Sequence, residues 1–133
     1  MGEITRVNWE LGKMDVFTLK NLLMQRMKTH DEVQWNLMMI GNQLGYNAVQ
    51  EYEVFNLVPN RPRSKIDVVW LSGDKIAVAF EVRRKTRDLD IPTSEKDRDK
   101  LARLNADEKF LVNFSKLTGA VYIFKMDNNG EWL

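Results

Sequence analysis

The sequence of 133 residues contains no cysteine. A disulfide framework and a zinc site built on thiolates are therefore excluded. A single histidine, His30, likewise excludes a metal centre built mainly from imidazole ligands. Any bound metal ion must then be held by oxygen atoms, and oxygen ligands favour Mg²⁺ or Mn²⁺.

The sequence also lacks long apolar runs and a signal-peptide pattern, so we expect an intracellular, cytoplasmic protein with no membrane partner. No glycine-rich phosphate loop is present, which argues against a nucleotide cofactor. The formal net charge is only +1. Total charge therefore gives no indication of nucleic-acid binding, and only the distribution of basic residues can do so.

The length predicts one domain over residues 1–133, because a chain of this size can bury a core. Hydrophobic residues make up 44% and charged residues 29% of the chain, as in soluble globular proteins. We expect residues 1–28 to form an N-terminal arm and helix, and residues 29–126 to form the core of the domain.

Two amphipathic helices are predicted in the first third of the chain. Residues 15–28 carry one apolar stripe at helical spacing. Thr29 and Glu32 form a capping-box pattern that begins a second helix, and Gly45 follows that helix as a stop signal. The stripes consist of Val16, Leu19, Leu23 and Met27 in the first helix, and Val33, Leu37, Ile40 and Leu44 in the second.

The remaining chain combines strands with one further helix. Pro59 and Pro62 predict a loop over residues 59–63, because proline cannot donate a hydrogen bond inside a central strand. Polar residues 86–93 predict a second loop, and Ser94 caps the helix that follows. The predicted strands are 48–57, 65–71, 75–84, 109–115 and 120–124, and the predicted helix is 95–107. This order predicts an α/β fold with a mixed central sheet flanked by helices.

Three charged residues lie inside strands that are otherwise apolar. Asp67 lies near the start of one strand of the predicted hairpin, and Glu81 and Arg83 lie near the end of the next. A buried carboxylate is costly unless it is paired with a cation or holds a metal ion. Two carboxylates on adjacent strands, with a cation close by, therefore form a candidate Mg²⁺ site for phosphodiester chemistry.

Whether the two carboxylates meet depends on the turn between the strands. A three-residue turn pairs Asp67 with Ala79, and makes Asp67 and Glu81 diagonal neighbours on one face with Cβ atoms roughly 6–8 Å apart. A two-residue turn pairs Asp67 with Phe80 and places the carboxylates on opposite faces. A bulge in the hairpin would restore the register in the second case.

The spacing of Ile66-Asp67 and Glu81-Val82-Arg83 resembles the motif of the PD-(D/E)xK nucleases, the restriction-endonuclease-like superfamily. That motif places an aspartate near the start of one strand, then a short hairpin, then Glu-x-Lys on the next strand. The wider pattern over residues 29–124 resembles small microbial and archaeal members of the superfamily. The lysine of the motif is replaced here by Arg83.

The resemblance implies an α-β-β-β-α-β core with an extra N-terminal helix, and divalent-metal-dependent hydrolysis of phosphodiesters by an endonuclease acting on DNA. Asp67 and Glu81 would hold Mg²⁺ or Mn²⁺ together with the carbonyl of Val82. Arg83 cannot be a general base, because the pKa of arginine exceeds about 12. Either Arg83 acts electrostatically, or Lys85 reaches back to take the place of the motif lysine.

The superfamily often adds an acidic or amide residue from the first core helix. His30 and Gln34 lie four residues apart at the edge of the apolar stripe. Gln34 is the candidate to hold a metal-bound water or a phosphate. His30 is explained better by a satisfied hydrogen bond at a helix N-terminus. Glu51 and Glu53, on the first strand, are expected to be exposed edge residues.

Basic residues flank both strands of the hairpin. They could contact phosphates on either side of the site, although a solvated rim at the strand ends produces the same pattern. The candidates for nucleic-acid binding are His30, Arg61, Arg63, Lys65, Arg84 and Arg87.

Two other interpretations fit the same residues. The replacement of the motif lysine by Arg83 favours a nuclease-like module that binds nucleic acid, or assembles with partners, without cutting. A cross-strand ion pair of Asp67 with Glu81 and Arg83 would have only a structural role. A chain of this size cannot surround a duplex, so a homodimer is expected, with the N-terminal helices, Trp9 or Trp132 at its interface.

Overall fold

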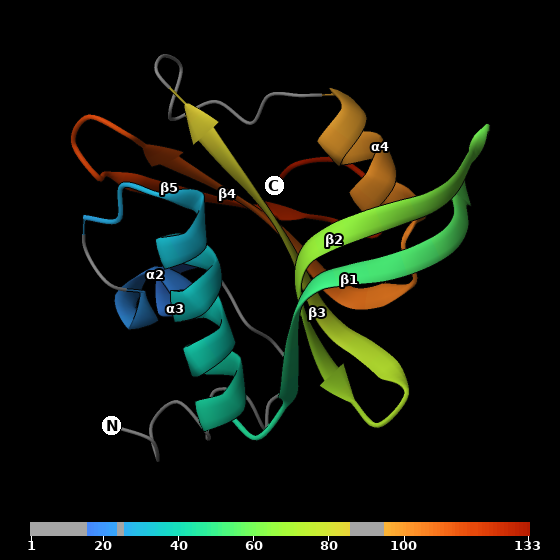
Figure 1. The fold of residues 1–133 in the computed structure, drawn as a ribbon, viewed down its shortest axis with the longest axis horizontal. Helices are drawn as coiled ribbons and strands as arrows, with labels where there is room; N and C mark the ends of the chain where they lie inside the picture. The colour runs from blue at the N-terminus through green and yellow to red at the C-terminus, as the bar shows by residue number, and fades with distance from the viewer. Residues whose placement is uncertain (1–15, 24–25, 86–94) are drawn as a thin grey trace.

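The computed structural model describes residues 16–23, 26–85 and 95–133. Within these ranges the elements follow the predicted order α-α-β-β-β-α-β-β (Figure 1). They are α2 (Val16–Leu22), α3 (His30–Gln43), β1 (Asn47–Val58), β2 (Arg61–Ser72), β3 (Lys75–Lys85), α4 (Glu95–Arg103), β4 (Ala106–Ser115) and β5 (Val121–Met126). No helix among them combines the length and the apolar character needed to cross a bilayer.

The five strands form one mixed sheet in the order β1-β2-β3-β4-β5. Neighbouring strands are antiparallel except β3 and β4, which are parallel. Parallel neighbours need a crossover connection, and α4 lies in the connection between β3 and β4. The prediction of an α/β fold with a mixed central sheet is confirmed.

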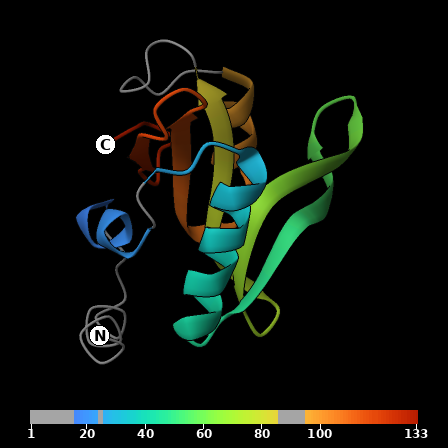
Figure 2. The ribbon, with the colours of Figure 1, turned by 60° about the vertical axis from the view of Figure 1, so that its left-hand side comes forward.

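Helices cover both faces of this sheet (Figure 2). α2 and α3 pack on one face, where Leu19, Leu37 and Phe80 belong to the larger core cluster. α4 packs on the other face, where Leu101 and Val69 belong to a smaller cluster. The sheet is therefore the middle layer of three, and a site at its edge can receive side chains from both helical layers.

Specific contacts fix α3 against β2. Thr29 Oγ1 accepts the backbone amide of Glu32 at 3.0 Å, so the predicted cap at the start of α3 is confirmed. Trp70 Nε1 donates to the carbonyl of Leu37 at 2.9 Å. Gly41 lies directly against the same indole, and a Cβ atom added there would stand 2.4 Å from it. These contacts also fix the N-terminal turn of α3.

Several element boundaries differ from the prediction. α2 covers only Val16–Leu22, although Leu23 and Met27 are buried as the predicted stripe requires. α4 ends at Arg103, four residues earlier than predicted. β4 begins at Ala106, three residues earlier than predicted, because its parallel pairing with β3 already starts there.

The predicted loop over residues 59–63 is wrong. Only the two residues before Arg61 form the turn, and β2 contains Pro62. The register of β1 and β2 shifts opposite this proline, and an irregular position tolerates a residue that cannot donate. The outer part of β1 and β2, residues 54–64, forms a hairpin arm that projects from the rest of the sheet (Figures 1 and 2).

β2 and β3 are joined by a two-residue turn with a bulge next to it. The bulge leaves Ala77 without a partner in β2, and beyond it Val68 pairs with Phe80. One residue further along the two strands, the same register places Asp67 opposite Glu81. Of the alternatives left by the sequence, the two-residue turn is the one found, and the bulge restores the register.

Some predicted features lie outside the described residues: the arm over residues 1–13, Trp9, the loop over residues 86–93 and Ser94. Trp132, the other candidate for a dimer interface, is half-buried. It forms a bridge with Met126 and packs on the smaller core cluster. Its role is therefore at least partly internal.

Candidate functional site

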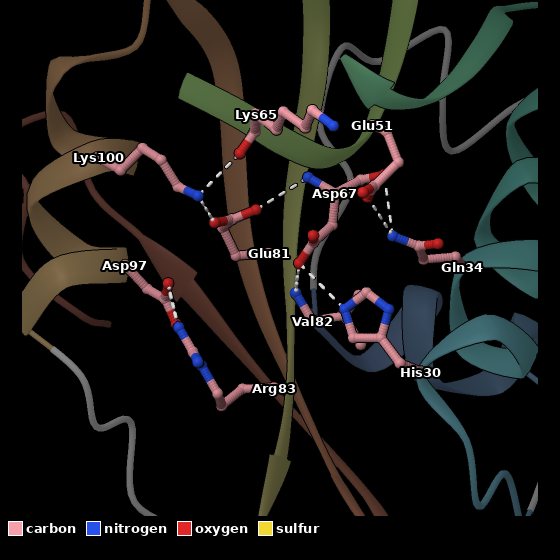
Figure 3. Close-up of polar contacts among 10 residues, drawn as sticks. All are labelled: His30, Gln34, Glu51, Lys65, Asp67, Glu81, Val82, Arg83, Asp97 and Lys100. Atoms are coloured by element: carbon pink, nitrogen blue, oxygen red, sulfur yellow. Dashed lines mark hydrogen bonds and ion pairs between the residues drawn. The ribbon is translucent and has the colours of Figure 1, made fainter. Parts of the chain in front are cut away.

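The ladder between β2 and β3 stops where the two candidate carboxylates lie (Figure 3). Beyond its last pair, Glu81 Oε2 accepts the backbone amide of Asp67 at 2.9 Å. In return, Asp67 Oδ2 accepts the backbone amide of Val82 at 2.7 Å. Each carboxylate thus replaces a backbone carbonyl as the hydrogen-bond acceptor for the opposite strand. The strands separate here, and the two acidic side chains bridge the gap.

Glu81 is almost completely buried, with 2% of its surface exposed. Its Oε1 forms an ion pair with the ammonium of Lys100 on α4, and Lys100 also donates to the carbonyl of Lys65 at 2.8 Å. Burial, and next the charge of Asp67, raise the pKa of Glu81 to about 8, although Lys100 opposes them. A carboxyl group that titrates near neutral pH is typical of functional sites.

Asp67 is contacted from the other layer by His30, the first residue of α3. His30 Nε2 lies 3.4 Å from Asp67 Oδ2, and this hydrogen bond raises the pKa of His30 above its ordinary value. Burial alone would raise the pKa of Asp67, but the hydrogen bonds from His30 and Val82 outweigh burial and lower it. The environment therefore shifts the pKa values of the two acids apart, so that Asp67 is ionised and Glu81 is protonated up to about pH 8.

Gln34 lies one turn after His30 on α3 and hydrogen-bonds to the backbone of Asp67. Its buried amide donates to Glu51 Oε2 at 2.9 Å and to the carbonyl of Asp67 at 3.4 Å. Glu51 is exposed, as predicted, but it lies opposite Asp67 in the register of β1 and β2 and has a left-handed backbone with φ of 52°. The Gln34 amide thus ties α3, β1 and β2 together and holds a third carboxylate beside the pair.

Arg83 is bound to α4. Its Nε donates to Asp97 Oδ2 at 2.7 Å, and its second terminal nitrogen donates to Asp97 Oδ1 at 2.5 Å. Asp97 is buried in the first turn of α4. Two parallel, charge-assisted hydrogen bonds make a strong and directional contact. The guanidinium is therefore directed at Asp97, away from the Asp67–Glu81 pair (Figure 3).

A cleft of about 560 Å³ opens over these residues. Three carboxylates line it: Asp67, Glu81 and Asp97. Six lysine and arginine side chains line it as well, and two of these, Lys100 and Arg83, are ion-paired with carboxylates of the cleft. The other four have no ion-pair partner in the described part of the chain: Lys28, Arg84, Lys96 and Lys116. The rim therefore has an excess of positive charge, which suits a polyanion.

The structure divides the predicted site residues into three groups. Those that line the cleft are His30, Asp67, Glu81, Val82, Arg83 and Arg84. Those directly behind it are Gln34 and Lys65. Arg61 and Arg63 lie instead on the hairpin arm, and Arg63 lies over the ring of Phe55. Lys85 lies at the end of β3 and is not among the described residues that line the cleft, and Arg87 lies outside the described residues.

Sequence reasoning missed Lys100 and Asp97, although both contact predicted site residues. The prediction of a helix over residues 95–107 assigned no role to its charged side chains. Asp97 lies four residues before Leu101 and therefore on the same face of the helix. A carboxylate on the inner stripe of a short polar helix is the signal that would have indicated a buried partner.

The donor set suits a divalent cation only in part. Asp67 and Glu81 are hard oxygen donors, and the carbonyl of Val82 is a third oxygen from the adjacent residue of β3. Among the described residues, no group of three or more acidic or histidine side chains has the arrangement of a metal site. A bound ion would compete with Lys100 for Glu81, so the site holds protein cations where a metal ion could be accommodated.

No known protein family matches this chain, and no curated protein sequence is similar to it. A crystal structure of a protein called SSO0001 is similar to this chain with a TM-score of 0.41 and 16% sequence identity. The similarity covers 90% of this chain and 61% of that protein, so this chain spans less than two thirds of its length.

Proposed function

We propose that this protein is a divalent-metal-dependent nuclease with a restriction-endonuclease-like core, and that it hydrolyses phosphodiester bonds in DNA. The observation that carries this proposal is the pairing of Asp67 and Glu81 where β2 and β3 separate. Two adjacent carboxylates, one almost completely buried, are costly unless a cation accompanies them. Four basic residues around the cleft have no ion-pair partner among the described residues, and they would contact the phosphates of the substrate.

Asp67 and Glu81 are the side chains that would hold Mg²⁺ or Mn²⁺, together with the carbonyl of Val82. When bound, the metal ion polarises the scissile phosphate and lowers the pKa of a bound water. Glu81 must lose its proton before it can bind, so its raised pKa makes metal loading depend on pH. Asp67 is already ionised, and His30 and Gln34 orient it from α3.

Lys100 supplies the ammonium that the motif lysine would otherwise provide. It enters from α4 and contacts Glu81 directly, which places a positive charge beside the carboxylate pair. Arg83 occupies the position of the lysine in the sequence but binds Asp97 on the same helix. Arg83 is therefore a positioning residue that fixes the first turns of α4 and, through them, Lys100.

Cleavage of labelled DNA tests this function. Duplex, single-stranded and branched substrates are incubated with Mg²⁺, with Mn²⁺ or with chelator. We expect metal-dependent cutting by the wild type and its loss in Glu81→Gln. Glu53→Gln is the matched control, because Glu53 is an exposed carboxylate on β1 with no part in the cleft. Cutting that persists in Glu81→Gln, or in chelator, would contradict the proposal.

A second candidate is a nuclease-like module that binds nucleic acid without cutting it. One observation favours it: Lys100 and Arg83 already contact Glu81 and Asp97, so both carboxyl groups have a protein cation beside them without a metal ion. This candidate requires binding that weakens with salt and ignores Mg²⁺. It is distinguished by DNA binding that is equal in the wild type and in Glu81→Gln, with no cutting by either protein.

A further inference from the structure

A second cleft lies beside α2 and the turn between β4 and β5. Its volume is about 650 Å³, and three basic residues line it: Lys20, Arg26 and Lys28. No carboxylate is found among the described residues that line it. Unlike the first cleft, its described lining therefore offers cations but no acidic group for a metal ion, which suits the binding of anions.

The two clefts are neighbours. Lys28 lines both of them. The turn between β4 and β5 separates them, since Lys116 lines the first cleft and Leu117, the next residue, lines the second. A ligand too long for the first cleft would therefore meet Lys28 and then the second cleft.

The second cleft also offers ring and apolar surface. Tyr122 lines it with 37% of its surface exposed, and the ammonium of Lys20 lies over one face of its ring, 5.2 Å from the centroid. Leu117 lines it with 75% exposed. Cations beside an exposed aromatic ring suit single-stranded nucleic acid, because the phosphates meet the cations and an unpaired base stacks on the ring. A duplex hides the faces of its bases and gains nothing from the ring.

The backbone that presents these cations is held in place. Arg26 has a left-handed backbone with φ of 64°. The amide of Met27 donates to the carbonyl of Gly119 at 3.1 Å, and a Cβ atom added to Gly119 would stand 2.7 Å from Arg26 Cα. Gly119 itself has a φ of 77°. A close approach of two backbones therefore joins the segment of Arg26 and Lys28 to the β4–β5 turn.

We propose that the second cleft binds a single strand of nucleic acid that continues from the first cleft over Lys28. Lys20, Arg26 and Lys28 contact its phosphates, and Tyr122 stacks against a base. This inference rests on the proposed function, because it takes the ligand of the first cleft to be a polynucleotide. It adds that the substrate has an unpaired segment next to the site of cleavage.

The test measures the affinity for fluorescent oligonucleotides by fluorescence anisotropy over a range of salt concentrations. Chelator is present throughout, because it prevents cutting. A single strand of about 12 nucleotides is compared with a blunt duplex of the same sequence. The variants are Lys20→Gln/Arg26→Gln and Tyr122→Leu. The control is Lys75→Gln/Arg103→Gln, which removes the same two charges from exposed ion pairs with Asp107 and Asp99, outside both clefts. Circular dichroism confirms that each variant is folded.

For the single strand, we expect the Lys20→Gln/Arg26→Gln variant to reduce the magnitude of the slope of log affinity against log salt by about 1.4. Each of the two lost phosphate contacts accounts for about 0.7 of this reduction. Tyr122→Leu should weaken single-strand binding about tenfold without changing that slope. The control should behave as the wild type. Single-strand binding that is unchanged in both cleft variants overturns the inference. Equal weakening for single strand and duplex overturns it as well.

The same experiments separate this inference from the proposed function. If no substrate is cut but the cleft variants lose single-strand binding, the nuclease proposal fails and the single-strand cleft stands. If DNA is cut in a Glu81-dependent manner but the cleft variants bind single strands normally, the nuclease stands and this inference fails.

Discussion

At the scale of single residues, the site depends on how protons are distributed between two carboxyl groups. The pKa of Glu81 is raised to about 8 by burial and by the charge of Asp67, whereas hydrogen bonds lower the pKa of Asp67. Glu81 can therefore exchange a proton for a metal ion near neutral pH, and Asp67 provides a permanent negative charge. Cation binding and proton release are coupled in such a pair.

The stability of the metal-free protein should fall as pH rises from about 5 to 8. Unfolded Glu81 ionises near its ordinary value of 4.5, whereas folded Glu81 keeps its proton to about pH 8, so the folded state binds more protons in this range. His30 acts in the same direction, because its raised pKa gives a stabilisation that is lost above its folded pKa. Each unit of difference is worth about 1.4 kcal/mol. Denaturant unfolding at several pH values measures the fall.

Two comparisons check the origin of this pH dependence. Glu81→Gln should remove most of the fall, because the group that titrates is gone. Added Mg²⁺ at pH 8 should stabilise the wild type, since a ligand that binds only the folded state raises the free energy of unfolding, and it should leave Glu81→Gln unchanged. A wild type with constant stability over this range would show that Glu81 is not protonated in the folded state.

Arg83 and Lys100 should differ in what their loss affects. Arg83→Ala removes the two charge-assisted hydrogen bonds that Arg83 gives to the buried Asp97, and we expect a loss of about 3 kcal/mol in the free energy of unfolding. Lys100→Met should instead lower cleavage about a hundredfold or more, because the charge beside Glu81 is lost. Thermal or denaturant unfolding and single-turnover cleavage, measured on both variants, separate the two effects. A larger activity loss in Arg83→Ala than in Lys100→Met would reverse these assignments.

At the scale of secondary-structure elements, the position of α3 matters most, because this helix delivers His30 and Gln34 to the site. Its contact with β2 at Gly41 and Trp70 has no spare room. An error in the position of α3 would move both side chains relative to Asp67. The core contact and the site are therefore linked through one rigid helix.

Gly41→Ala should destabilise the protein by about 2 kcal/mol. Alanine in an exposed helix would stabilise relative to glycine by up to about 1 kcal/mol, but here its Cβ atom would overlap the Trp70 indole. Denaturant unfolding with Trp fluorescence measures the loss. Gln43→Ala, at the exposed end of the same helix, is the control and should stay close to the wild type. A stabilised Gly41→Ala would mean that α3 can move away from β2.

Periodicity and capping signals were sufficient to predict the order of elements, the start of α3 at Thr29 and the candidate pair of Asp67 and Glu81. They were insufficient where the structure depends on distant partners. Pro62 suggested a loop, yet pairing across the arm keeps it in β2. Lys100 and Asp97 come from a helix whose position on the sheet no local pattern encodes. The pairing of Arg83 with Asp97 could be found only in three dimensions.

At the scale of the whole molecule, three basic regions surround the site: the rim of the first cleft, the second cleft and the hairpin arm. The arm projects from the sheet (Figure 1) and carries Arg61 and Arg63 on exposed strand positions. These arginines are remote from the carboxylates. Under the proposed function they would bind the outer part of a duplex without taking part in its cleavage.

Replacing both arm arginines, as Arg61→Gln/Arg63→Gln, should weaken duplex binding. The magnitude of the slope of log affinity against log salt should fall by about 1.8, because each of the two lost phosphate contacts accounts for about 0.9. Cleavage at saturating DNA should not change. Anisotropy and cleavage of the same labelled duplex measure both quantities. An unchanged salt dependence would exclude the arm from the duplex interface.

The bulge at Ala77 has a consequence for how the chain can vary in length. In a hairpin closed by a two-residue turn, opposed residues are always an odd number of positions apart, as Ser72 and Lys75 are. Asp67 and Glu81 are 14 positions apart, an even number, and only the extra residue lets them meet. With the bulge kept, insertion or deletion of one residue elsewhere in this hairpin would switch the parity and separate the acids, whereas deletion of Ala77 itself would leave them opposed in a regular hairpin. Changes of two residues would preserve the pair.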